Sequence, residues 1–392
     1  MRRIYLDNAA TSFPKPDSVL EATQRYWQSI GASAGRGAYA EAVQTGTLIQ
    51  QCRANIAELI HAECAETIVF GMNCTDGLNL AIRGLLKPAD HAITTWMDHN
   101  SVLRPLNALT EQIGLEVTFV ACDGRTGRVD PDDIAAAIRP NTRLIAVVHG
   151  SNVTGTVQPI RPIGAIARER GIPYLVDAAQ TCGHWPIDVQ ADLIDLLAAP
   201  GHKGCLGPLG TGFLYIRPGM ERWVRPIKEG GTGSISEQAV HPEFMPDRYE
   251  SGSHNAVGIV GLGAGVRWVL ERGVEAVRAH ERRLCEVFLT TAEAVEGLTV
   301  YGPRDLDERV GVFSVRLEGY TPAELSAALE TNFGVLTRSG LHCAPLAHRT
   351  IGTYDLGGTT RFSFGPFVQP ADVAYAASAL AELSHVARAP SV

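Results

Sequence analysis

The sequence predicts an α/β protein in two parts: a large domain on a mostly parallel sheet of seven strands, and a smaller α+β domain. Three observations predict this architecture. Short β-rich runs alternate with amphipathic helical stretches between residues 65 and 216. After residue 217 the alternation gives way to long helical patterns mixed with a few strands. The length of 392 residues suits two or three domains at about 150 residues each.

Seven runs in the first part have the length and composition of strands. They are 67–71, 91–96, 115–121, 143–150, 172–178, 192–199 and 210–216. Amphipathic helices are predicted between several of them, including 75–86 and 162–171. Strands that alternate with helices form parallel sheets covered on both faces. Because such sheets bind ligands at the carboxyl ends of their strands, we expect the functional site there.

The second part begins with one or two long helices over 258–295. Its other predicted elements are short runs at 300–302, 310–317, 335–339 and 359–364 and helices at 322–333 and 371–387. We place the large domain at 15–261 and the small domain at 1–14 and 262–392. The glycines of GLGAG at 261–265 do not follow a strand and lack the full G-x-G-x-x-G spacing. They indicate close helix packing and not a dinucleotide site.

Charge and hydropathy exclude some classes of partner. The 34 basic and 42 acidic residues give a net charge of −8 without a basic block, which disfavours a nucleic-acid surface. The N-terminal segment MRRIYLDNAATSF lacks the apolar core of a signal peptide. No apolar run reaches the roughly 18 residues of a membrane span, so we expect no membrane partner and a cytoplasmic location.

The eight cysteines contain no C-x-x-C pair. This spacing argues against a zinc ribbon or a disulfide framework. In a reducing compartment we expect free thiols, most of them buried as small apolar side chains. A reactive cysteine must therefore be identified from its surroundings.

Two polar residues end predicted strands. Asp177 closes LVD, where a carboxylate can keep a pyridine nitrogen protonated, although a turn or helix-cap aspartate would look the same. Gln180 lies three residues further and could contact the same ligand. Lys203 follows the next strand within PGHKG, where partial desolvation lowers the pKa of an amine enough for a Schiff base. A solvated lysine is the alternative.

A third element is the predicted strand, turn and helix of GMNCTDGLNL. Free N–H groups at the helix start, together with Cys74 and the hydroxyl of Thr75, form the geometry that binds phosphate. A threonine at this place is also a common simple cap. A phosphate cradle, a strand-end acid and a Schiff-base lysine in this order jointly indicate pyridoxal phosphate.

Seven motifs extend this interpretation across the chain. They are LDNAAT (6–11), ITTWMDHNSVLRPL (93–106), HGSNVTGT (149–156), LVDAAQ (175–180), GHKG (201–204), RYESGSHN (248–255) and RSGLHCAPLAHRTIGT (338–353). In this order they resemble the fold-type I, class V aminotransferase family of pyridoxal phosphate enzymes. Within that family the sequence is similar to the cysteine desulfurase and selenocysteine lyase branch.

The resemblance implies a role for each cofactor-site residue. Lys203 matches the lysine bonded to the cofactor, Asp177 the partner of the pyridine nitrogen, and His99 the ring-stacking histidine and candidate acid or base. Gln180 and Asn152 match contacts near the phenolic oxygen. The residues that match the family's phosphate-binding site are Thr75, His202 and the backbone at Cys74. Ser253 matches a hydroxyl that reaches the phosphate from the partner subunit, which implies a homodimer.

The substrate site is implied in the same way. Arg361 matches the arginine that pairs with the substrate carboxylate, for which a planar guanidinium is suited, and Asn152 contributes beside it. Cys343 matches the cysteine that becomes a persulfide. Its segment lacks helical or strand periodicity, so we expect an exposed loop, where Arg338, His342 and His348 could favour the thiolate. An inert packed cysteine is the alternative, and a metal site is disfavoured because no second ligand pair exists.

Two positions depart from the family pattern. Pro200 stands where many desulfurases have a serine that contacts the phosphate, and SFGPF at 363–367 replaces an aromatic-Asn pair. The resemblance implies that L-cysteine becomes L-alanine while its sulfur passes to Cys343 and then to an acceptor protein. The short loop suggests slow basal turnover. Alternatives are a selenocysteine lyase acting on L-selenocysteine, a cystine C–S lyase, or a non-catalytic scaffold that keeps the fold.

Overall fold

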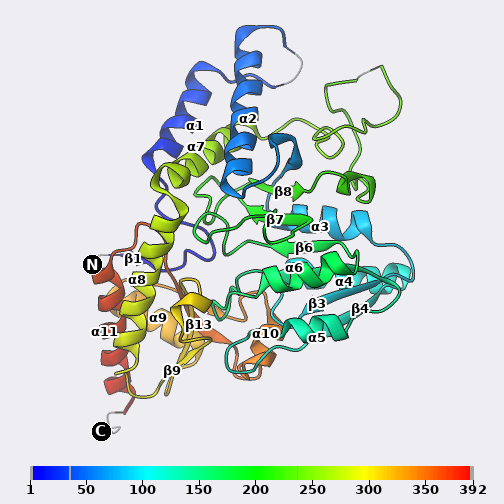
Figure 1. The fold of residues 1–392 in the computed structure, drawn as a ribbon. Coiled ribbons are helices and arrows are strands. Elements are labelled where there is room, and N and C mark those ends of the chain that lie inside the picture. The colour runs from blue at the N-terminus through cyan, green and yellow to red at the C-terminus, as the bar shows by residue number, and fades with distance from the viewer. Residues whose placement is uncertain (1–2, 35–36, 236, 389–392) are drawn as a thin grey trace.

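The computed structural model describes residues 3–34, 37–235 and 237–388, and its centre is a seven-stranded sheet (Figure 1). The order across this sheet is β2-β8-β7-β6-β5-β3-β4. The strands are β2 (Ile68–Gly71), β3 (His91–Thr95), β4 (Glu116–Val120), β5 (Thr142–Val148), β6 (Tyr174–Asp177), β7 (Leu196–Pro200) and β8 (Gly212–Ile216). Each lies within or overlaps a predicted run, so the predicted sheet is confirmed.

Only β8 runs against the other strands of this sheet. It pairs antiparallel with both β2 and β7, whereas β3 to β7 pair in parallel with one another. The carboxyl ends of β2, β3, β5, β6 and β7 therefore meet at one edge. These strand ends and the segments that follow them carry the predicted cofactor-site residues other than Ser253.

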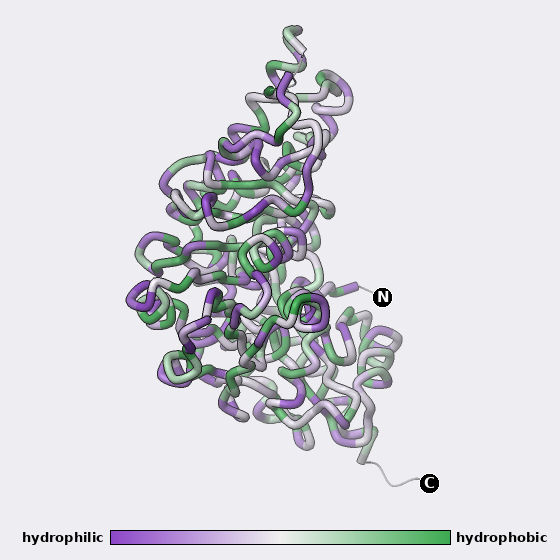
Figure 2. Tube along the Cα trace, turned by 90° about the vertical axis from the view of Figure 1, so that its right-hand side faces the viewer, coloured by the Kyte–Doolittle hydropathy of each residue, from purple (hydrophilic) through white to green (hydrophobic). Residues whose placement is uncertain are grey.

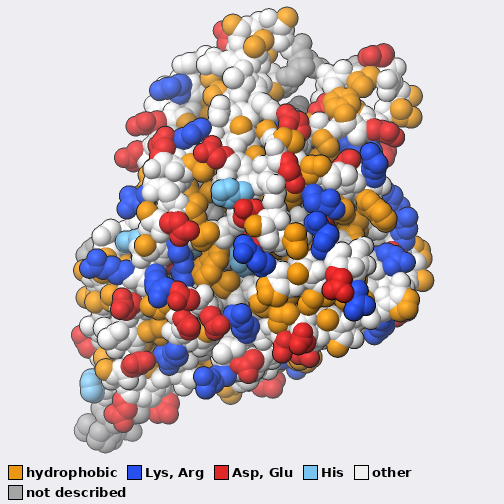
Figure 3. Space-filling view, viewed as in Figure 1, with side chains coloured by type: hydrophobic (Ala, Val, Ile, Leu, Met, Phe, Trp, Pro, Cys, Tyr) orange, Lys and Arg blue, Asp and Glu red, His pale blue; other side chains and the backbone are white. Residues whose placement is uncertain are grey.

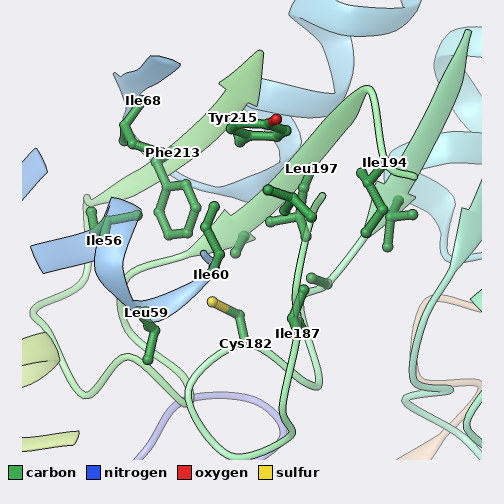
Figure 4. Close-up of a cluster of buried hydrophobic side chains, with 14 of the residues drawn as sticks. Ile56, Leu59, Ile60, Ile68, Cys182, Ile187, Ile194, Leu197, Phe213 and Tyr215 are labelled. Carbon is green, nitrogen blue, oxygen red and sulfur yellow. The ribbon is translucent and has the colours of Figure 1, made fainter. Parts of the chain in front are cut away.

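Both faces of the sheet are covered by helices. Along β5, Leu144 and Ala146 pack into one apolar cluster, and Ile145 and Val147 pack into another, as the two-residue period of a strand requires. The first cluster includes α3 (Cys74–Leu85) and α4 (Asn100–Ile113). The second includes α2 (Ala40–Leu59), α5 (Pro131–Ala136), α6 (Ile160–Glu169) and α7 (Ala256–Arg272). Figure 4 shows part of it, where Ile56 and Ile60 lie beside Phe213.

The C-terminal part has its own antiparallel sheet and apolar core. The sheet has the order β12-β13-β10-β9, with β9 (Leu298–Tyr301), β10 (Val312–Leu317), β12 (Arg338–Gly340) and β13 (Thr359–Ser363). Its helices are α8 (Val274–Ala292), α9 (Pro322–Phe333), α10 (Pro345–Thr350) and α11 (Pro370–Arg388). Phe288 contacts Phe313 and Phe362 within this core.

The first residues of the chain join this C-terminal part. β1 (Ile4–Tyr5) pairs in parallel with β11 (Val335–Leu336), and Ile4 and Leu6 are buried in the same core as Phe288. Figure 1 shows the N-terminal end of the chain beside α8 and α11. The proposed domain boundary at 261 and 262 stays a prediction, and it falls within α7.

The glycines of GLGAG lie inside α7, which packs against α1 (Asp17–Ser29) and α2. A Cβ on Gly261 would lie 2.7 Å from Pro208, and one on Gly265 would lie 2.5 Å from the carbonyl oxygen of Cys205. The prediction that these glycines permit close helix packing is correct. Gly273, with φ of 83°, separates α7 from α8, so the two-helix alternative for this region holds.

The surface mixes charge and apolar groups. Figure 2 shows hydrophilic and hydrophobic residues alternating along the chain, and Figure 3 shows acidic and basic side chains interspersed on one face. Among the described helices, none is long and apolar enough to cross a membrane. Short 3-10 helices complete the fold at η1 (Ala65–Thr67), η2 (Met220–Arg222) and η3 (Leu306–Glu308).

Candidate active site

A pocket of about 100 Å³ lies at the shared carboxyl edge of the large sheet. The segments after β2, β3, β5, β6 and β7 each contribute side chains to it. Its lining includes eight of the predicted cofactor-site residues: Cys74, Thr75, His99, Asn152, Asp177, Gln180, His202 and Lys203. The sheet thus brings together residues that are up to 129 positions apart in sequence, since 203 − 74 = 129.

Asp177 is buried at the end of β6. Its Oδ1 accepts hydrogen bonds from the backbone N–H of Ala179 at 2.9 Å and from the Cys74 thiol at 3.5 Å. Burial raises the pKa of Asp177, while the backbone hydrogen bond and the Lys203 ammonium oppose that rise. A buried carboxylate that stays ionised needs a cationic partner, and a protonated ring nitrogen would supply one.

Lys203 lies in a loop fixed by close backbone packing. Neither Gly201 nor Gly204 has room for a Cβ, because Thr211 crowds the first and the carbonyl of Cys182 the second. Burial lowers the pKa of Lys203, and the charges of Asp177 and Cys74 partly restore it. A desolvated amine of this kind has the neutral form available that nucleophilic attack on an aldehyde requires.

His99 is the N-cap of α4. Its Nδ1 accepts the backbone N–H of Ser101 at 3.1 Å and lies 2.7 Å from the Ser101 hydroxyl. Burial lowers the pKa of His99 to about 3, and the charges of Lys203, Arg338 and two further arginines lower it in the same direction. His99 is therefore neutral at physiological pH.

Two buried polar atoms in this pocket have no partner in the described chain. They are Oδ1 of Asn152 and Nδ1 of His202. Buried polar groups in proteins are almost always hydrogen-bonded, so both atoms call for a polar ligand. With the start of α3, where backbone N–H groups are available, they form a set that fits a phosphorylated pyridine aldehyde.

The N-terminal segment 7–15 packs against this pocket, which the sequence alone did not indicate. The carbonyl of His202 accepts the backbone N–H of Ser12 at 3.0 Å and the ammonium of Lys15 at 2.8 Å. Gln180 donates through Nε2 to the carbonyl of Ala9 at 3.0 Å. These contacts join residues that are at least 171 positions apart, so no local sequence pattern indicates them.

Arg361 lies buried in β13, opposite Arg338 of β12. Its Nη2 donates to Oδ1 of Asp7 at 2.7 Å and its Nη1 to the carbonyl of Asn152 at 3.2 Å. Burial lowers the pKa of Arg361, and Asp7 opposes that shift. The Nε of Arg361 has no partner in the described chain, so the guanidinium keeps donor capacity for a carboxylate.

Cys343 is exposed on a short connection between β12 and α10, as predicted. Nη2 of Arg338 lies 3.7 Å from its sulfur. Both His342 and Cys343 are left-handed, with φ of 50° and 59°, a costly conformation for residues other than glycine. The backbone N–H of Asn100 donates to the Cys343 carbonyl at 2.8 Å, and Asn152 Nδ2 donates to the His342 carbonyl at 2.6 Å.

Two details of this segment differ from the sequence prediction. The stretch expected to lack regular structure contains α10, which Pro345 begins at a position where its missing N–H costs nothing. The rings of His342 and His348 are buried, with hydrogen bonds to Thr359 and Thr353. Arg338, and neither histidine, makes the contact with the Cys343 sulfur that the structure shows.

Within a single chain, Ser253 does not line the pocket of Lys203. It is exposed and lines a different pocket, which also includes Asp76 and Lys228. Its predicted contact with the phosphate of a partner subunit stays a prediction. Pro200 lines the pocket of Lys203, where it offers no side-chain donor. Among the described residues, no three His, Cys, Asp or Glu side chains form a group that could hold a metal ion.

The chain is similar to known proteins over most of its length. Residues 4–375 match the family Aminotransferase class-V. A probable cysteine desulfurase of Methanothermobacter thermautotrophicus is 36% identical over 363 residues, covering 92% of this chain and 89% of that protein. A cysteine desulfurase of Yersinia pseudotuberculosis is 34% identical, covering 87% of this chain and 84% of that protein.

Solved structures of cysteine desulfurases are also similar to this chain. The apo structure of the cysteine desulfurase from Thermococcus onnurineus NA1 has a TM-score of 0.92 and 32% identity, covering 98% of this chain and 95% of that one. The cysteine desulfurase CsdA of Escherichia coli has a TM-score of 0.86 and 26% identity, covering 97% of this chain and 94% of that one. The chain therefore belongs to the class V aminotransferase family of pyridoxal phosphate enzymes, and its sequence and fold group it with the cysteine desulfurases.

Proposed function

We propose that this protein is a pyridoxal phosphate-dependent cysteine desulfurase that moves the sulfur of L-cysteine to Cys343. One observation carries the proposal most directly. The exposed Cys343 is hydrogen-bonded through its own backbone and that of His342 to Asn100 and Asn152, which flank or line the pocket of Lys203. A nucleophilic thiol thus lies at the rim of a site suited to amino-acid chemistry.

The cofactor would be held by residues of the pocket. Lys203 would bond it covalently, Asp177 would face its ring nitrogen, and the start of α3 with His202 would bind its phosphate. When bound, pyridoxal phosphate supplies an electron sink for the α-carbon of an amino acid. Arg361 binds the substrate carboxylate and so orients the amino acid. The amine of Lys203 takes and returns the α-proton.

The sulfur transfer balances without an added oxidant. The thiolate of Cys343 attacks the sulfur of L-cysteine, an S–S bond forms, and the substrate C–S bond breaks. The β-carbon gains the electron pair and a proton, which yields L-alanine, and Cys343 becomes a persulfide. Arg338 stabilises the negative charge on the attacking sulfur through its contact at 3.7 Å.

Mass spectrometry of the loaded enzyme after L-cysteine tests this proposal. We expect one added sulfur on the peptide that contains Cys343 and an equal amount of L-alanine. Cys343→Ala should lose both, whereas Cys64→Ser, which removes another exposed cysteine, should retain both. Sulfur on Cys64 alone, or none on any cysteine, would contradict the proposal.

The same variant separates the related activities. A selenocysteine lyase does not need the loop thiol because selenium leaves more readily, so Cys343→Ala would keep its activity on L-selenocysteine. A scaffold that lacks catalysis would stay colourless with pyridoxal phosphate and show no borohydride-reducible bond at Lys203. A yellow, reducible enzyme that requires Cys343 supports desulfuration of L-cysteine.

We also propose a homodimer that delivers sulfur to an acceptor protein. The exposure of Ser253 supports a contribution to the partner's phosphate site, and the exposure of Cys343 supports access by a second protein. Sedimentation should give twice the chain mass of 42.0 kDa. A monomer that binds the cofactor and forms the persulfide would contradict the dimer but not the chemistry.

A further inference from the structure

We propose that Ser101 and the first turn of α4 fix His99 as the neutral tautomer with its proton on Nε2, so that His99 donates a hydrogen bond to the bound reactants and does not accept their protons. This inference rests on the proposed function, because it assigns a role within that same pocket. It revises the expectation that His99 is a candidate acid or base. It also makes the backbone N–H of Ser101 the group that positions the ring, which the sequence did not suggest.

The hydrogen bonds of the ring determine the tautomer. A backbone N–H can only donate, and that of Ser101 points to Nδ1 of His99 at 3.1 Å, so Nδ1 carries a lone pair. The Ser101 hydroxyl, 2.7 Å from the same atom, can rotate to donate as well. Since a neutral imidazole bears one ring proton, that proton lies on Nε2. Both His99 and Ser101 line the pocket, so the ring is placed where it can meet a ligand.

The surroundings oppose a second ring proton. A proton on Nδ1 would face the N–H of Ser101, and the positive end of the α4 dipole lies at the same place. The charges of four cationic side chains also disfavour a protonated His99. They are Arg104 of α4 itself, Lys203 of the loop after β7, Arg338 of β12 and Arg361 of β13. The carboxylate of Asp177 shares the pocket, and Asp98, directly before His99, is bound by Thr94 and Thr95.

The role follows from this arrangement. An imidazole that already bears the Nε2 proton has no free site facing the pocket for another, and its remaining lone pair is occupied by Ser101. It can stabilise negative charge that develops on an oxygen or sulfur atom, as a neutral histidine at a helix start does elsewhere. Proton transfer at the α-carbon then falls to Lys203, whose lowered pKa makes its neutral amine available.

Nitrogen NMR of the histidine-labelled holoenzyme tests the tautomer without measuring turnover. His99→Asn, which keeps an oxygen that can cap α4, identifies the His99 signals among the 12 histidines by their loss. We expect a protonated Nε2 and an unprotonated Nδ1 from pH 5.5 to 8.5. A proton on Nδ1, or a titration within this range, would overturn the proposal whether or not the enzyme desulfurates L-cysteine.

Variants test the role independently. His99→Gln places an amide N–H donor further into the pocket than His99→Asn does. If His99 is a donor, we expect His99→Asn to lower kcat about 100-fold, as loss of one charge-stabilising donor does. We expect the kcat of His99→Gln to be about tenfold higher than that of His99→Asn. The pH dependence of kcat/KM should keep its shape in both. Equal losses in the two variants, or a limb of the pH profile that disappears with His99, would assign proton transfer to it instead.

Ser101→Ala provides the matched control. It removes the hydroxyl and keeps the backbone N–H, so the Nε2 tautomer should persist in its NMR spectrum. A switch to the Nδ1 tautomer in this variant would show that the helix N–H does not hold the ring, which would overturn the proposed geometry. His99→Gln also provides the signal assignment if His99→Asn does not fold.

Discussion

At the scale of single residues, the ion pair with Asp7 orients Arg361, which we propose to bind the substrate carboxylate. Arg361 is almost completely buried, at 1% exposure, and its position depends on Asp7 and on the carbonyl of Asn152. Asp7 has two opposed effects. It orients the guanidinium, and its charge weakens the attraction of Arg361 for a second carboxylate.

Two substitutions of Asp7 separate these effects. Asp7→Ala removes the oriented contact, and loss of a charge-assisted hydrogen bond worth about 1.5–3 kcal/mol should raise KM for L-cysteine at least tenfold. Asp7→Asn keeps an oxygen acceptor and removes the charge, so its KM should rise much less. Steady-state kinetics with L-cysteine give both values. A larger rise in Asp7→Asn than in Asp7→Ala would contradict the orienting role.

The sequence predicts some site residues better than others. Asp177 ends β6 and Lys203 follows β7, and the rule that ligands bind at the carboxyl ends of parallel strands places both in one pocket. Asp7 and Ser101 were missed for different reasons. The partner of Asp7 is 354 positions away, and no local pattern reports such a pair. Ser101 acts on a ring two residues away, but only the helix geometry shows that its N–H faces that ring.

At the scale of elements, α7 links packing to the position of Lys203. Gly265 of α7 faces the backbone at Cys205 and Leu206, in the loop that follows Lys203. A Cβ on Gly263 would instead lie 3.2 Å from the Cβ of Cys52, a tight contact that a shift of a few tenths of an ångström would relieve. Helix α7 thus packs directly against the loop that contains Lys203. Periodicity predicted the helix, but only its packing shows which glycine lies against that loop.

These two glycines form a matched pair for a stability experiment. Gly265→Ala forces a Cβ to within 2.5 Å of a carbonyl oxygen, which we expect to cost about 1–3 kcal/mol beyond the gain in helix propensity. Gly263→Ala has the same gain of about 1 kcal/mol in propensity and a milder contact, so it should stay near neutral. Urea unfolding gives both values. Equal stability of the two variants would contradict the packing that we describe.

The Cys343 connection is the element that the sequence described least well. Its glycine and proline content indicated a loop, and the exposed cysteine was predicted correctly. The left-handed conformations of His342 and Cys343 depend on hydrogen bonds from Asn152 and Asn100, which belong to the other part of the chain. Such tertiary contacts override local preference, and no sequence window contains them.

At the scale of the whole molecule, the alternation of β-rich runs with helical stretches was sufficient to predict the large sheet. One apolar cluster lies on each face of it, and a third lies in the C-terminal part. Several histidine rings are buried, and burial keeps them neutral. Burial lowers the pKa of His149 to about 3, with the charge of His184 adding to the effect, and burial lowers that of His348 to about 4.

These rings make stability depend on pH. The unfolded chain protonates them below their ordinary pKa of 6.5, whereas the folded protein resists protonation until about pH 3 to 4. Stability should therefore fall as the pH drops below 6.5, by up to about 1.4 kcal/mol per pH unit for each such ring. Urea unfolding between pH 7 and 5 measures the slope. His149→Gln should reduce it, and His385→Gln, at an exposed site, should not.

The pairing of Asp7 with Arg361 also sets an order of events during synthesis. The ribosome adds Asp7 early, but it adds Arg361 only when more than nine tenths of the polypeptide has been made. Until then the chain lacks the guanidinium that we propose as the anchor of the substrate carboxylate. A product of translation that stops before β13 therefore contains Lys203 without this arginine, and we expect it to be inactive.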